Sequence, residues 1–311
     1  QVWEGAEAVD LSAPHADYTH GLDIRHGRTF GGYTWNSPEG GTLRVDFERF
    51  ASYHHLHLVV QQLTIRTDRK TRLTLRAGVD AELWSLHGEH FSRYLPFLEE
   101  GVRGVECRTT ETGLPVAVAC SWRLDGTKPE NVREEPSGTS SFMLLDYSLS
   151  EGDSIVLEQM MSVYSGNDTE NPREKAVELA ADAAEKGYDE LAARSDLIWD
   201  DMWMNYHMKI DSSDNAQALL HYNLYHNIIA TPAHTDHLPI GARGLSCQAY
   251  QGAAFWDQEI FNLPMFLYTD PNVAKNLLIY RYRTLDGARR KARRLGYYGA
   301  FYAWISGDTG D

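Results

Sequence analysis

The spacing of apolar residues changes once along this chain, at Asn171, and this change constrains the fold more than any other feature. Before Asn171, apolar residues alternate or run together over the length of single strands, between frequent Gly and Asp residues. After it, they recur every three or four residues, which is the period of an α-helix. The pattern predicts a β-rich part followed by a helical part.

Several segments of the first part are typical of strands. They are residues 43–47, 56–60, 73–77, 116–120, 142–147 and 154–158. Short apolar or alternating segments separated by turns are typical of an antiparallel β-sandwich. We predict this domain over residues 1–166.

A helical segment follows, and Pro172 suits its first position because proline lacks the N–H that a helix start leaves unpaired. Val177, Ala180 and Ala184 then fall on one face, and Gly187 interrupts the pattern. A second helical pattern starts at Asp189. We interpret residues 167–207 as a helical linker.

Residues 208–311 carry two further helical patterns, at 219–229 and 273–295, with long loops rich in Gly and Pro between them. Helices joined by long loops after a β domain suggest the start of an all-α catalytic barrel. In such a barrel the loops build the active site.

The net charge, the lengths of the apolar runs and the cysteine count limit which partners the chain can bind. A formal net charge of -15 disfavours nucleic acid, because a phosphate backbone attracts basic surfaces. No apolar run approaches the roughly 20 residues that span a bilayer, so no membrane partner is expected. The 3 cysteines fit neither a disulfide framework nor a zinc site, and we expect a cytoplasmic protein. Gln1 stands where an initiator Met is expected, so the chain is predicted to be a fragment.

The densest group of chemically useful residues lies in the loop of residues 241–259. A pyranose ring needs a flat apolar surface against its C–H face and charged acceptors for its hydroxyls, and Trp256 beside Asp257 offers both. The alternative is that Trp256 fills a core and Asp257 caps the next helix. Spacing alone does not separate these interpretations.

A resemblance favours the first interpretation. The run Phe255-Trp256-Asp257-Gln258-Glu259-Ile260-Phe261, followed by Tyr280-Arg281-Tyr282, resembles glycoside hydrolase family 65 in order and spacing. A looser similarity near residues 49–58 extends the resemblance over nearly the whole chain. The resemblance implies a β-sandwich, a helical linker and the first part of an (α/α)6 barrel.

The family consists of inverting disaccharide phosphorylases, so the resemblance implies a carbohydrate substrate, inorganic phosphate as co-substrate and no cofactor. It also implies a homodimer. Trp256 and Asp257 are expected to hold the glucosyl ring, with Phe255 packed beside them. Glu259 and Trp304 are further candidates for substrate binding, although Glu259 could instead support the loop.

Two departures from the family pattern concern the sugar site. Cys247-Gln248-Ala249-Tyr250 replaces the common Gly-Glu-x-Tyr. Ile305 stands where the family's Tyr-Pro-Trp-Glu-Ser has its carboxylate, which leaves the acceptor open. The general acid Glu of the family is expected beyond Asp311, so no catalytic residue is assigned and the fragment alone is expected to be inactive.

Three functions remain open at this point. The first is phosphorolysis of an α-glucosyl disaccharide or glucoside to β-glucose 1-phosphate; the second is an inverting α-glucosidase on the same scaffold. The third is a sugar-binding module without catalysis. The cluster His234-Thr235-Asp236-His237 is interpreted as a loop and not as a metal site.

Overall fold

The computed structural model describes residues 1–12, 15, 17–86, 88–212 and 214–310, so Asp311 lies outside the described residues. The chain divides into two compact units, Gln1–Asp200 and Asp201–Asp311. The first is built mainly from strands and the second mainly from helices. The change of pattern at Asn171 therefore separates β-strands from helices, as the sequence predicts.

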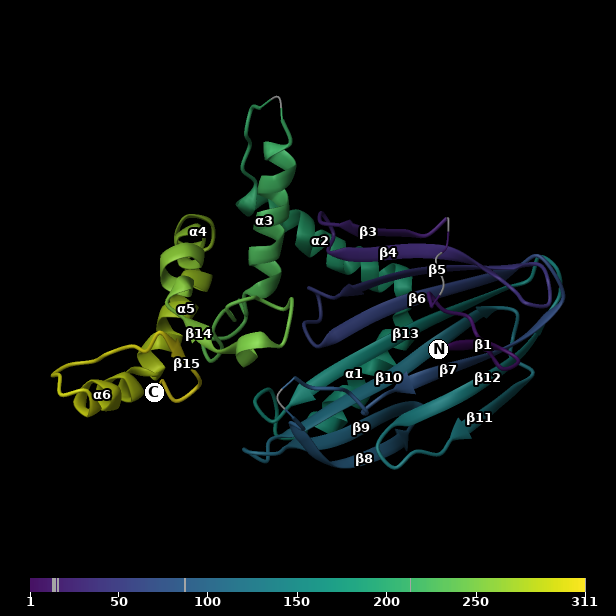
Figure 1. Ribbon diagram of the computed structural model, residues 1–311, viewed down its shortest axis with the longest axis horizontal. Helices are drawn as coiled ribbons and strands as arrows, with labels where there is room; N and C mark the ends of the chain where they lie inside the picture. Colours follow the sequence, from purple (N-terminus) through teal and green to yellow (C-terminus); the bar gives the residue numbers. More distant parts are fainter. Residues whose placement is uncertain (13–14, 16, 87, 213, 311) are drawn as a thin grey trace. The chain divides into compact units, whose positions relative to one another are not determined.

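Two antiparallel sheets form most of the first unit (Figure 1). The smaller sheet has the strand order β11-β12-β7-β1-β2. Its strands are β1 (Val2–Glu4), β2 (Glu7–Ala8), β7 (Thr71–Val79), β11 (Asn131–Glu135) and β12 (Ser141–Leu149).

The larger sheet has the strand order β3-β4-β5-β6-β13-β10-β9-β8. Its strands are β3 (Thr19–Asp23), β4 (Arg28–Asn36), β5 (Thr42–Ala51), β6 (Leu58–Thr67), β8 (Phe91–Glu99), β9 (Val102–Thr109), β10 (Pro115–Gly126) and β13 (Ser154–Ser165). Each of the six segments predicted as strands overlaps one of the strands in these two sheets.

The main core lies between the two sheets and draws on both. Leu43 and Ile65 from the larger sheet pack in one cluster with Leu75 and Leu145 from the smaller sheet. Side chains on a strand alternate between its two faces. On β6, for example, Ile65 faces this core, whereas Val60 belongs to a separate cluster on the other face.

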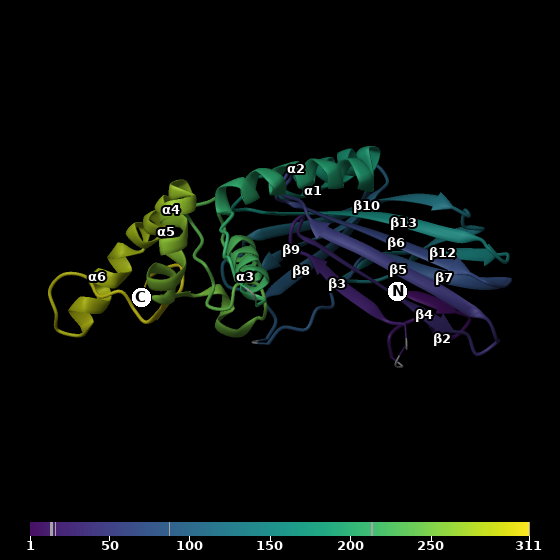
Figure 2. The same cartoon turned by 90° about the horizontal axis from the view of Figure 1, so that it is seen from above.

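Two helices cover part of that other face, as Figure 2 shows. They are α1 (Pro172–Lys186) and α2 (Tyr188–Tyr206). Ala176 and Ala180 of α1 pack on Ala117 and Ala119 of β10. Gly187 separates the helices at a φ of 81°, and a Cβ there would lie 1.7 Å from the Arg123 guanidinium. A residue larger than glycine would displace this arginine.

Besides the last residues of α2, the second unit contains four α-helices among its described residues. They are α3 (Ala216–Ala230), α4 (Leu263–Thr269), α5 (Pro271–Arg283) and α6 (Leu285–Arg294). Shorter elements are η1 (Ala249–Gly252), β14 (Ala254–Phe255), η2 (Gln258–Asn262) and β15 (Ile305–Ser306). No helix among the residues described is both long and apolar enough to cross a membrane.

The helical pattern predicted over residues 273–295 forms two helices, α5 and α6, which Thr284 divides. The Thr284 hydroxyl donates to the carbonyl oxygens of Tyr280 and Arg281. Such side-chain hydrogen bonds compete with those of the helix backbone. Gly310 also packs so closely on Thr284 that a Cβ there would lie 2.3 Å from the Thr284 carbonyl oxygen.

The three cysteines differ in burial, and this difference predicts their reactivity. Cys247 is exposed, whereas burial of Cys120 raises the pKa of its thiol to about 12. The thiolate is the reactive form, so at pH 8 we expect a disulfide reagent to label Cys247 within minutes and Cys120 only after unfolding. Labelling followed by mass spectrometry tests this, and equal labelling of both thiols in the folded chain would contradict it.

The pKa of the Cys120 thiol is higher in the folded chain than in the unfolded chain. Burial of the neutral thiol therefore contributes fully to the free energy of unfolding at pH values below the unfolded-state pKa. This contribution is lost as the pH rises towards the folded-state pKa.

Candidate functional site

Two hollows border the segment from Phe255 to Asn262. The first, here called the Asp257 hollow, has a volume of about 390 Å³ and lies between α3, residues 240–246 and this segment. The second, the Trp256 hollow, has a volume of about 450 Å³. It is lined by Trp256, Glu259, Leu278, Arg281, Phe301, Tyr302, Ala303 and Trp304.

A short β-ladder fixes the start of this segment. Phe255 of β14 pairs with Ile305 of β15, and the chain then turns at Trp256 into the single π-helical turn η2. Successive residues of this turn point to different sides. Asp257 therefore lines the first hollow and Trp256 lines the second, although the sequence predicts that both touch one glucosyl ring.

Asp257 offers a carboxylate that the fold does not use. It stands just before η2 but makes no capping hydrogen bond, so the interpretation of Asp257 as a helix cap is wrong. Among the described residues, no side chain or backbone N–H is paired with this carboxylate. A half-buried, unpaired carboxylate is a strong acceptor for substrate hydroxyls.

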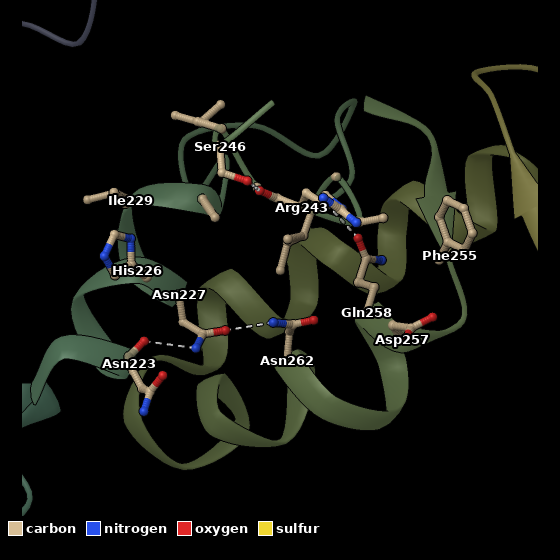
Figure 3. A pocket seen from close by; sticks show the side chains of 16 residues that line it. Asn223, His226, Asn227, Ile229, Arg243, Ser246, Phe255, Asp257, Gln258 and Asn262 are labelled. Carbon is tan, nitrogen blue, oxygen red and sulfur yellow. Dashed lines mark hydrogen bonds between the residues drawn. The ribbon is translucent and has the colours of Figure 1, made fainter. Parts of the chain in front are cut away.

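Figure 3 shows how the Asp257 hollow is lined by polar groups from three segments. Asn262 donates to the Asn227 side chain at 2.6 Å, and Asn227 donates to the Asn223 carbonyl oxygen at 2.9 Å. Arg243 enters from the loop, with its guanidinium 6.0 Å from the Tyr250 ring centroid. The hollow thus combines one carboxylate, one guanidinium and several amides, which suits a polyhydroxylated ligand.

Trp256 does not fill a core in this structure. Its exposed fraction is 40%, and that of Trp304 is 66%. The two ring centroids lie 5.3 Å apart with a tilt of 49°, and the Phe261 ring centroid lies 5.9 Å from that of Trp256. The structure therefore brings Trp256 and Trp304 together as two open aromatic faces, a surface on which a pyranose can stack.

Phe255 and Glu259 lie beside these residues in supporting positions. The half-buried Phe255 ring lines the Asp257 hollow and meets Tyr250 edge-on at 5.0 Å. Glu259 lines the Trp256 hollow, but both of its carboxylate oxygens accept hydrogen bonds from Arg281, at 2.7 and 2.9 Å. The negative charge of Glu259 is therefore paired with Arg281.

The sequence does not predict a role for two residues of the site, Gln258 and Arg281. Gln258 is 1% exposed; its side chain accepts from the Ile240 N–H at 2.7 Å and donates to Glu259 at 2.7 Å. Arg281 is 8% exposed and donates hydrogen bonds to Glu259, Ser306 and the Phe255 carbonyl oxygen. The signal that could have pointed to Arg281 is its place in the Tyr280-Arg281-Tyr282 block that resembles the family.

The His234–His237 cluster makes an ordinary surface contact. Asp236 accepts a hydrogen bond from Arg283 at 3.0 Å. No group of three or more potential metal ligands occurs among the described residues.

Family profiles match almost the entire chain. Residues 4–202 match "Glycosyl hydrolase family 65, N-terminal domain", and residues 221–311 match "Glycosyl hydrolase family 65 central catalytic domain". The chain belongs to glycosyl hydrolase family 65. The family resemblance seen in residues 255–282 is thereby confirmed.

Curated members of family 65 align over most of the chain. The 1,2-alpha-glucosylglycerol phosphorylase of Bacillus selenitireducens is 43% identical over 98% of this chain and 39% of its own length. The kojibiose phosphorylase of Halothermothrix orenii is 32% identical over 94% of this chain and 40% of its own length. The chain thus spans about two fifths of the length of these relatives.

A solved structure shares the fold. It is a human-microbiome protein provisionally named as a kojibiose phosphorylase, with a TM-score of 0.88 at 22% identity over 100% of this chain and 41% of its own. The order of an antiparallel β-rich part followed by a helical part is therefore that of family 65.

Proposed function

We propose that the protein containing this chain cleaves the α-glucosidic bond of a disaccharide or glucoside by inverting phosphorolysis, releasing β-glucose 1-phosphate. The observation that carries this proposal is the unpaired carboxylate of Asp257, next to the exposed ring of Trp256, within the family's Phe-Trp-Asp-x-Glu block. The named activities of the curated relatives, which are α-glucoside phosphorylases, support the same reaction.

In this proposal, Asp257 accepts hydrogen bonds from hydroxyls of the glucosyl ring in the Asp257 hollow. The aromatic face of Trp256 contacts the sugar in the Trp256 hollow. Phe255 and Glu259 hold these two residues, and Trp304 extends the aromatic surface. Inversion requires a carboxylic acid that protonates the leaving oxygen while phosphate attacks from the opposite face. We assign the acid and the phosphate site to segments that follow residue 311.

The proposed organisation follows the family. Residues 1–166 form the β-sandwich, 167–207 the helical linker and 208–311 the first part of an (α/α)6 barrel, to which α3, α4, α5 and α6 contribute. No organic cofactor enters the reaction, and phosphate is the co-substrate. The protein acts as a homodimer on a small carbohydrate.

The acceptor of this enzyme is a small polyol or sugar. In this chain Ile305 is 44% exposed and stands where a carboxylate is common in the family; it follows Trp304, which lines the Trp256 hollow. An aliphatic side chain there removes one charged acceptor for hydroxyls. This favours glucosides whose leaving group offers few hydroxyls at that position, such as glucosylglycerol, over disaccharides.

The full-length protein incubated with maltose, kojibiose, nigerose, trehalose or 1,2-alpha-glucosylglycerol tests this function. We expect release of glucose 1-phosphate from one or two of the five, only when inorganic phosphate is present, and fastest from glucosylglycerol. A matched reaction with sulfate in place of phosphate is the control. Equal release of free glucose in both buffers would identify an α-glucosidase, and failure to bind any of the five would remove the proposed substrate class.

A further inference from the structure

One buried guanidinium contacts both ends of the segment that carries the proposed sugar-binding residues. Arg281 Nε and Nη2 donate to the two carboxylate oxygens of Glu259, at 2.7 and 2.9 Å. Nη2 also donates to the carbonyl oxygen of Phe255 at 2.8 Å, and Nη1 donates to the Ser306 hydroxyl at 3.2 Å. The Arg281 backbone carbonyl in turn accepts from the Tyr302 hydroxyl at 3.0 Å.

The contacts of Arg281 restrain the residues between Phe255 and Glu259. Phe255 and Glu259 flank Trp256 and Asp257, so one rigid side chain fixes both flanks of the two residues. The hydrogen bond to Ser306 also restrains β15, because Ser306 lies in this strand, two residues after Trp304. Arg281 therefore ties together the two hollows and both tryptophans.

We propose that Arg281 is a positioning residue that sets the relative placement of Trp256, Asp257 and Trp304, and so of the two hollows. The inference deepens the proposed function and rests on it for its kinetic consequence only. Arg281 acts through Phe255, Glu259 and Ser306, and it is not a catalytic residue.

The chemistry of the guanidinium supports this role over simple packing. Burying a charge is costly unless the charge is well paired, and an apolar side chain of similar volume would fill the same space at lower cost. What a planar guanidinium adds is a fork of donors in fixed directions, which matches a carboxylate in two bonds and leaves further donors for neighbours. Lysine carries the same charge but lacks this fork.

Arg281→Lys in the full-length protein tests the proposal. A shift of about 1 Å in a binding group can lower turnover by roughly 100-fold, so we expect kcat/KM to fall by about 100-fold, mostly through kcat. The matched control is Arg283→Lys on the same helix. The Arg283 guanidinium bonds Asp236 at 3.0 Å but has a side-chain exposure of 47%, and its substitution is expected to leave kinetics within about twofold.

A second readout does not depend on activity. With 5-fluorotryptophan incorporated, the ¹⁹F resonances of Trp256 and Trp304 can be assigned from single Trp→Phe variants. We expect Arg281→Lys to shift or broaden these two resonances, while those of Trp35 and Trp199 in the first unit stay unchanged. Arg283→Lys is expected to move none of the four.

The Glu259→Gln variant keeps the test valid if Arg281→Lys does not fold. It retains the side-chain shape and one oxygen acceptor, so we expect the same two resonances to move and kcat/KM to fall by about 10-fold. When both variants fold, their effects are expected to be non-additive in the double variant, because they disrupt one shared fork.

Unmoved Trp256 and Trp304 resonances in Arg281→Lys and Glu259→Gln would overturn the positioning role, whatever the enzyme's activity. So would additive kinetic effects in the double variant. A wild-type protein that releases no glucose 1-phosphate would instead overturn the proposed function, and the resonance shifts would then still decide the role of Arg281.

Discussion

Asp257→Ala is expected to reduce kcat/KM of the full-length enzyme for its α-glucoside by at least about 100-fold. The Asp257 carboxylate is half-buried and makes no hydrogen bond to other described residues, so its bonding capacity is available to substrate. A hydrogen bond to a charged group contributes about 1.5–3 kcal/mol. Two such bonds to glucosyl hydroxyls amount to about 3 kcal/mol or more, which is roughly 100-fold in rate.

Two further variants make this prediction specific. Asp257→Asn keeps the shape and loses the charge, so its kcat/KM is expected to lie between those of the wild type and Asp257→Ala. Asp286→Ala removes an acid of the same unit whose side chain is 81% exposed and pairs with Arg289; it is expected to leave turnover within about twofold. Unchanged kinetics in Asp257→Ala, with the wild type active, would remove Asp257 from the site.

Leu145→Ala is expected to lower the free energy of unfolding of the first unit by about 2–5 kcal/mol. Leu145 of β12 is 1% exposed and packs in the core between the two sheets. Truncating such a side chain loses its transfer free energy and leaves a cavity that the close-packed surroundings fill only in part. Urea unfolding followed by circular dichroism measures the change.

Leu197→Ala serves as the matched control for the core variant. Leu197 lies on α2 with an exposed fraction of 70%, and alanine is at least as good a helix former. Its substitution is expected to change the free energy of unfolding by about 0.5 kcal/mol or less. If the two variants were equally destabilised, the assignment of the core between the sheets would be contradicted.

Six of the strands and both ends of α1 could be predicted from the sequence, because local patterns determine them. Leu43 and Val45, or Leu73 and Leu75, alternate with polar residues, and both pairs lie in the core between the sheets. Pro172 and Gly187 mark the ends of α1 through backbone properties that neighbours do not alter. Strand alternation and the residues at helix ends depend on neighbouring residues alone, so they can be recognised in the sequence.

What the sequence did not reveal depends on residues far apart in the chain. The break at Thr284 is accompanied by close packing of Gly310, 26 residues later. The fork of Arg281 reaches Phe255, Glu259 and Ser306, which lie 22 to 26 positions away. Adjacent positions also do not imply a shared hollow, because the turn after β14 sends Trp256 and Asp257 to different sides.

NMR of the full-length protein with 1,2-alpha-glucosylglycerol, recorded through both ³¹P and anomeric ¹H signals, distinguishes phosphorolysis from hydrolysis and reports the configuration of the product. We expect that β-glucose 1-phosphate forms as inorganic phosphate disappears, and that no product forms without phosphate. Free glucose formed at the same rate with or without phosphate, or glucose 1-phosphate in the α configuration, would contradict it.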